Sequence, residues 1–155
     1  LNGNAVIRHG LDWLLANAAG DALPLVQFHD GGDAGPGPHV LPALSVPAAR
    51  AALRALLQLR QRGLREPLRF APYTGWVLYN APAEKQRSEG WKQWHGSDRS
   101  WGESSSDAWQ LLLRGADPFA TDAGYADLLR NSQLVFSAVR EGRALGTEAR
   151  QEGNA

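Results

Sequence analysis

Only one stretch of this sequence, residues 23–45, carries the pattern of β-strands, and this limits the fold more than any other feature. Residues 23–29 alternate loosely between apolar and polar side chains, and residues 39–45 predict a return strand. The residues between them, 30–38, are rich in glycine and proline and predict a loop. Pro42 falls inside the return strand, so that strand is expected at the edge of a sheet. The sequence therefore predicts a single long-looped hairpin.

Helical patterns lie on both sides of this hairpin. Asn4 is expected to cap a helix that runs to about Ala19 and ends at Gly20. Ser45 starts the clearest helix, which has Pro47 in its first turn and ends at Gly63. Helical spacing predicts the inward-facing residues as Ile7, Leu11, Leu14, Leu15 and Ala18 on the first helix, and Leu53, Leu56 and Leu57 on the second.

Shorter helices and a long final helix are predicted after a connector at residues 66–74. In chain order, the expected helices run from Thr74 as cap to Asn80, from Pro82 to about Trp94, from Ser106 or Asp107 to Arg114, and from Thr121 or Asp122 to about Arg140. The inward residues of the last helix are expected to be Tyr125, Leu128, Leu129, Phe136 and Val139.

These elements predict an α-rich α+β fold with one β-hairpin and about five to seven helices. We divide the chain into a helix–hairpin–helix portion at residues 1–65 and a helical packing region at residues 66–141. Residues 142–155 are small, polar and aperiodic, and we expect a disordered tail there.

Composition excludes several classes of protein. The 155 residues include no cysteine, which rules out disulfides and thiolate ligands and is consistent with a cytoplasmic protein. The net charge is zero, whereas a domain that binds nucleic acid by itself usually has a basic excess. No apolar run approaches the length of a membrane span, and no signal peptide is evident. The chain opens on Leu1 and lacks methionine, which indicates a piece of a longer protein.

The motifs of common catalytic sites are missing. Neither lysine follows a glycine, so no phosphate-binding loop exists. Metal-dependent nucleases of the restriction-enzyme type need an acid two residues before a lysine, but Ala83 and Gly90 stand at those positions. One candidate metal site remains, in a hydrolase that would use His29, Asp30 and Asp33 of the hairpin loop, with His39 across it. The alternative is that these are ordinary turn residues.

Two other groups of side chains could contact a partner or DNA. Arg50 and Arg54, with Gln58 and Gln61, line the polar side of the second helix, which is otherwise simply the solvated face. Four tryptophans, Trp91, Trp94, Trp101 and Trp109, fall close together. We expect Trp91, Trp94 and Trp109 to pack in the core, and Trp101, in a polar loop, to remain available for a subunit contact.

The order of segments resembles the C-terminal end of the exodeoxyribonuclease V gamma subunit (RecC) family. The pieces that carry the resemblance are Gly63 to Pro72, Gly102–Glu103 with Asp107 and Trp109, and Arg114–Gly115 with Asp117–Phe119. The similarity covers about residues 1 to 141 and rests on structural motifs, not catalytic ones.

The resemblance implies a subunit that works by contacts. Family members join a helicase–nuclease beta subunit and a helicase alpha subunit in a complex that unwinds and degrades DNA ends for recombination. The C-terminal domain would be a partial restriction-endonuclease-like domain without an active site, without cofactors, and with roles in subunit assembly and strand guidance. The alternatives are the metal-dependent hydrolase and an unrelated protein-interaction module.

Overall fold

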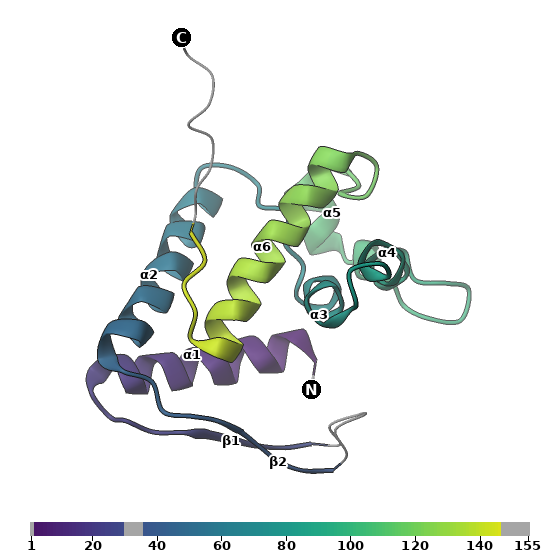
Figure 1. Ribbon diagram of the computed structural model, residues 1–155. Coiled ribbons are helices and arrows are strands. Elements are labelled where there is room, and N and C mark those ends of the chain that lie inside the picture. Colours follow the sequence, from purple (N-terminus) through teal and green to yellow (C-terminus); the bar gives the residue numbers. More distant parts are fainter. Residues whose placement is uncertain (1, 30–35, 147–155) are drawn as a thin grey trace.

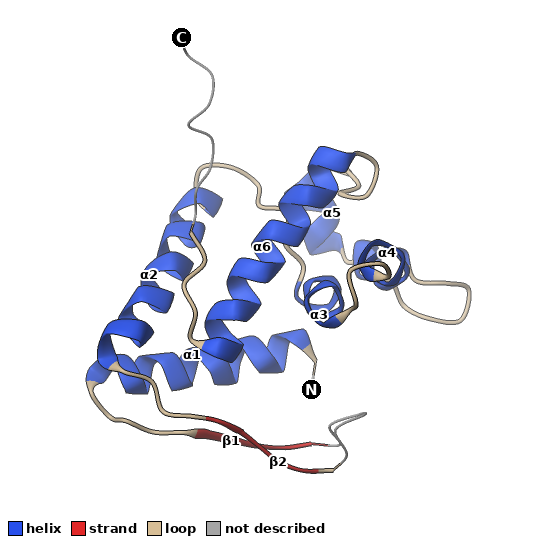
Figure 2. Ribbon diagram, viewed as in Figure 1, coloured by secondary structure: helices blue, strands red, loops and turns tan. Residues whose placement is uncertain are grey.

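A computed structural model describes residues 2–29 and 36–146 of the chain as helices arranged around one short hairpin (Figures 1 and 2). Within these residues there are six α-helices, one 3₁₀ helix and two strands, which confirms the α-rich α+β class and the expected number of helices. In chain order the elements are α1 Gly3–Ala19, β1 Leu25–His29, β2 Gly37–Leu41, α2 Val46–Gly63, α3 Pro72–Asn80, α4 Gln86–His95, η2 Glu103–Ser105, α5 Asp107–Leu113 and α6 Asp122–Glu141.

The first two helices form where their capping residues predict them, with one correction. Ser45 caps α2 by accepting a hydrogen bond from the backbone N–H of Ala48 at 3.4 Å, and Pro47 lies in the first turn. Gly20 ends α1 with a left-handed φ of 111°, which glycine adopts without steric cost. The predicted cap Asn4 is wrong, because the helix begins earlier and Asn2 accepts from Ala5 N–H at 3.0 Å.

The hairpin is antiparallel, and its register pairs Leu25 with Leu41 and His29 with Gly37. Its inner face packs on the helices, where Leu25 and Leu41 join the main hydrophobic core. Arg140 of α6 donates to Gln27 Oε1 at 2.8 Å and so ties β1 to the last helix. The return strand runs from Gly37 to Leu41, so its predicted extent of 39–45 is wrong, and Pro42 follows the strand instead of lying inside it.

Helices α3 to α5 form a second group on the other side of α6 from α2 (Figure 1). Pro72 occupies the first turn of α3, and Thr74, predicted as its cap, is instead fully buried one turn inside the helix. The N-terminus of α3 is capped from a distance by Glu103, whose carboxylate accepts from the backbone N–H groups of Tyr73 and Thr74. Helix α5 ends at Leu113, one residue before the predicted Arg114, and both Arg114 and Gly115 are left-handed, with φ of 52° and 73°.

The last helix, α6, is the central element of the core. Thr121 caps it by accepting from Gly124 N–H at 3.0 Å, as the sequence predicted. Phe136 and Val139 join Val6, Trp13 and Leu14 of α1 in the main cluster. Closer to the N-terminus of the same helix, Leu128 joins the cluster around Leu78 and Trp94. Leu134 and Val135 join the cluster around Leu59.

Two predicted helix faces differ from the observed ones. Leu15 and Leu57 are 57% and 56% exposed, although both were expected in the core. The buried side of α2 is made by Ala49, Ala52, Ala55 and Leu59 instead. Small alanines let the backbones of neighbouring helices approach, so Leu53 and Leu56 are only partly buried and Leu57 lies outside this face.

Of the predicted tail, residues 142–146 are described. Gly142 ends α6 in a left-handed conformation with φ of 63°, and a Cβ there would lie 2.4 Å from the Leu44 side chain. The rest of that predicted tail lies outside the described residues. Within the described part of the chain, no helix combines the length and apolarity that crossing a bilayer requires.

Candidate functional site

The three residues predicted as DNA or partner contacts do not form one site. Arg50 and Arg54 are exposed on α2, and Arg50 Nε donates to the backbone oxygen of Ala18 at 3.1 Å, which ties α2 to the end of α1. Trp101 is 56% exposed and belongs to the segment that follows α4. Figure 1 shows α4 on the other side of α6 from α2. The ring of Trp101 packs edge-on against Tyr73 at a centroid distance of 5.8 Å, a neighbour that its polar sequence surroundings did not predict.

The candidate metal site is largely outside the described residues, which leave out Asp30, Asp33 and the side chain of His29. His39 is half-buried in β2, opposite Gln27 in the register. Among the residues that the structure describes, no group of three or more His, Asp or Glu side chains could hold a metal ion.

The tryptophan cluster is split between the core and the surface. Trp94 is 4% exposed and packs with Leu78 and Phe119, as expected. Trp91 is 49% exposed and stacks on the ring of His95 at 4.4 Å, so the prediction that it packs beside Trp94 is wrong. The reason is the close approach of Gly90 to Leu78, which makes positions 90 and 94, not 91 and 94, the inward stripe of α4.

Trp109 is also less buried than predicted. Its ring is half-buried beside the second core cluster with Leu113, while Leu112 of the same helix is 41% exposed. None of the residues of α5 is fully buried, so this short helix lies on the surface of the domain. Two tryptophans, Trp91 and Trp101, are therefore exposed in place of the single one expected.

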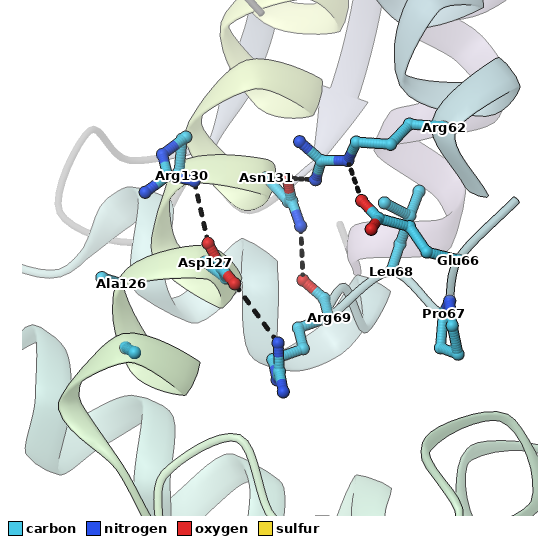
Figure 3. A pocket seen from close by; sticks show the side chains of 10 residues that line it. Arg62, Glu66, Pro67, Leu68, Arg69, Ala126, Asp127, Arg130 and Asn131 are labelled. Atoms are coloured by element: carbon cyan, nitrogen blue, oxygen red, sulfur yellow. Dashed lines mark hydrogen bonds and ion pairs between the residues drawn. The ribbon is translucent and has the colours of Figure 1, made fainter. Parts of the chain in front are cut away.

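Charged side chains surround a pocket of about 450 Å³ that sequence reasoning missed (Figure 3). It lies between the end of α2, the connector that follows it and the first half of α6. Its charged and amide lining residues are Arg62, Glu66, Arg69, Asp127, Arg130 and Asn131. We refer to it as the arginine pocket.

Two residues of α6 hold the arginines of this pocket in place. Asp127 accepts from Arg69 Nη1 at 3.2 Å through one oxygen and from Arg130 Nη1 at 2.8 Å through the other. Asn131, which is 1% exposed, accepts from Arg62 Nη2 at 2.6 Å and donates to the backbone oxygen of Arg69 at 3.0 Å. The buried amide therefore bonds both to the last turn of α2 and to the connector, and it ties both of them to α6.

A second hollow of about 280 Å³ adjoins the arginine pocket and shares Glu66, Pro67 and Arg69 with it. Its other wall comes from α5 and the residues after it, among them Leu112 and Arg114. The sequence signal for these hollows is limited to Arg62 and Arg69 in an arginine-rich segment, because Arg130 and Arg114 join them only through the tertiary fold.

The side of the hairpin that faces away from the helices is wholly apolar. Val26 pairs with Val40 and Phe28 with Pro38, and these four side chains alternate with the inward-facing residues. Phe28 is 80% exposed, Val40 56% and Val26 45%. We call these four residues the outer face of the hairpin. An exposed apolar face of this kind is typical of an interaction surface.

Comparison with known proteins agrees with the resemblance noted in the sequence. No curated protein matches the chain. The family model described as the RecC C-terminal domain matches residues 1–83, which include α1, the hairpin, α2 and α3. This match covers more than half of the chain. The chain therefore belongs to the RecC C-terminal domain family and, with it, to the proteins that form the RecBCD exodeoxyribonuclease V complex.

Proposed function

We propose that this chain is a non-catalytic C-terminal part of the exodeoxyribonuclease V gamma subunit, which contributes to subunit assembly and DNA strand guidance in double-strand break repair by homologous recombination. Its partners are the beta and alpha subunits and, within the complex, DNA, and its location is the cytoplasm. The domain is a partial, inactive restriction-endonuclease-like unit. Family membership supports this proposal, and the observation that carries the assembly role is the outer face of the hairpin.

The outer face suits a protein contact better than solvent. Its cross-strand pairs, Val26 with Val40 and Phe28 with Pro38, place apolar side chains next to one another without a charged residue between them. Burying such a surface against a partner contributes roughly 25 cal/mol per Å² of apolar area removed from water. Trp101 offers a second exposed ring for such a contact, and the exposed Arg50 and Arg54 offer polar ones.

The assembly role is tested by weakening the outer face in the full gamma subunit. Phe28→Ser and Val40→Ser should reduce the recovery of beta and alpha subunits with a tagged gamma subunit, because each removes apolar area from the contact. Leu57→Ser is the matched control, since Leu57 is as exposed as Val40 but lies on α2. Trp101→Ala is expected to weaken assembly as well. Equal recovery of the partners with the Phe28, Val40 and Leu57 variants would contradict the assembly role of this face.

The proposal that the chain is non-catalytic rests on the residues that precede its two lysines. Ala83 and Gly90 occupy the positions where an acid would precede Lys85 and Lys92, so neither lysine belongs to a nuclease motif. Incubation of the chain with linear DNA and magnesium or manganese should leave the DNA intact. Degradation that disappears when Asp30 and Asp33 are replaced would favour the hydrolase alternative instead.

A further inference from the structure

We propose that the arginine pocket binds phosphate groups of a nucleic-acid strand and that the adjoining hollow continues this path along the surface. The inference rests on the proposed function, because it gives the strand-guiding role a physical site. Figure 3 shows Arg62, Arg69 and Arg130 around one opening, although they come from α2, the connector and α6. Guanidinium groups are suited to phosphate because their planar fork of N–H donors matches two phosphate oxygens.

The arginines that face this pocket keep donors for a ligand. A guanidinium has five N–H donors. Arg69 and Arg130 each use one nitrogen, Nη1, for Asp127. Their side chains are 41% and 50% exposed, so their remaining donors can be reached from solvent. Arg62 differs, since Nε faces Glu66 and Nη2 binds Asn131, and it contributes mainly a fixed positive charge.

The local charge also favours an anion. The arginine pocket has three arginines against Glu66 and Asp127, and the adjoining hollow adds Arg114 without a further acid. This excess is local, because the net charge of the whole chain is zero. Two adjoining hollows lined by arginines fit a polymer that carries an anionic group at every repeat. A nucleic-acid strand has this property, whereas a single acidic side chain of a protein partner would occupy only one of the hollows.

Asp127 explains how the arginines stay together without a ligand. Its two oxygens separate Arg69 from Arg130 and offset the repulsion between them. A phosphate that enters the pocket must compete with this carboxylate for the same donors. Asp127 is therefore expected to limit the affinity for DNA, and its removal should act in the direction opposite to removal of the arginines.

The experiment measures DNA affinity of the reconstituted complex with variants in the gamma subunit. The probe is a fluorescent duplex with single-stranded tails, titrated over a range of salt concentrations. The Arg69→Gln/Arg130→Gln double variant should lower the slope of log affinity against log salt by about one to two units, since each phosphate contact to a single strand contributes roughly 0.7. The charge-matched control, Arg8→Gln/Arg99→Gln, changes exposed arginines that line neither hollow and should leave the slope unchanged. Asp127→Asn should tighten binding.

Each outcome decides the proposal. A reduced slope in an intact complex, with partial recovery by Arg69→Lys/Arg130→Lys and tighter binding by Asp127→Asn, supports a phosphate site. An unchanged slope in an intact complex overturns it and leaves the assembly role of the hairpin untouched. Loss of the beta or alpha subunit from the arginine variant, with an unchanged slope for the complex that remains, also overturns it and assigns the pocket to a protein carboxylate.

Discussion

Glu103 caps helix α3 from 29 residues away, with its Oε2 2.7 Å from the backbone nitrogen of Thr74. Its other oxygen accepts from the backbone N–H of Tyr73 at 3.2 Å. The local cap position, Ala71, supplies no side-chain hydrogen bond, so Glu103 replaces the residue that usually satisfies these N–H groups. The side chain is 1% exposed, and it joins the segment after α4 to the start of α3.

Replacing Glu103 with alanine should lower the free energy of unfolding by about 1–3 kcal/mol, because the buried N–H of Thr74 and the partly buried N–H of Tyr73 lose their acceptor. Urea denaturation of the chain, followed by circular dichroism, measures this change. Glu84→Ala is the control, since Glu84 is exposed and should change stability by less than about 0.5 kcal/mol. Equal midpoints for the two variants would show that the distant cap contributes nothing.

The raised pKa of Glu103 should also appear in the pH dependence of stability. Burial raises the pKa of its carboxyl above the ordinary value, although the N–H groups of Thr74 and Tyr73 act in the opposite direction. Between the ordinary and the raised pKa the folded state therefore binds more protons than the unfolded state. Stability should fall as pH rises through this window, and Glu103→Gln should flatten that part of the profile. A profile that Glu103→Gln leaves unchanged would contradict this.

Tyr79 should ionise well above an ordinary tyrosine. Burial, together with the hydrogen bond to Glu141, raises the pKa of its hydroxyl from 10.0 to about 12. Because the folded pKa is the higher one, the contribution of Tyr79 to stability should be lost as pH rises from about 10 to about 12. Ultraviolet titration measures the ionisation, and Glu141→Gln should move the pKa of Tyr79 back toward 10.0. Tyr79→Phe identifies the transition, which must vanish in that variant.

The two tryptophans of α4 should differ sharply in their effect on folding. Trp94→Ala should lower the free energy of unfolding by about 3–5 kcal/mol, as expected for a buried aromatic ring. Trp91→Ala should cost less than about 1.5 kcal/mol, since the ring is 49% exposed and stacks on His95. Chemical denaturation compares the pair, and a larger loss for Trp91 than for Trp94 would mean that the core of α4 has been assigned to the wrong face.

Local signals predicted the elements of this fold well. Ser45 and Thr121 cap the helices that the sequence assigned to them, and Gly20 ends the first helix, because caps depend on only a few neighbouring residues. Thr74 shows the limit of such signals. It has the residue type of a cap, but the real cap is Glu103, which no local pattern can indicate.

Features of the fold that depend on tertiary packing were harder to predict from the sequence. Leu57 has the spacing of a core residue, yet α2 buries alanines against its neighbours and leaves Leu57 exposed. Likewise, the arginine pocket joins Arg62 to Asn131 across 69 residues, a contact that exists only after the helices have packed. The sequence therefore revealed the family and the elements, whereas the candidate site required the fold.

The position of α6 has a consequence for the order of events during synthesis. Phe136, Leu128 and Leu134 of this helix each belong to a different core cluster, and it is the last helix of the described chain to be translated. The earlier helices can pack on one another, as α1 does on α2 and α3 on α4, but none of the three clusters can close before α6 emerges. We therefore expect the apolar surface that α6 covers in the folded domain to remain open to solvent on the nascent chain until this last helix emerges.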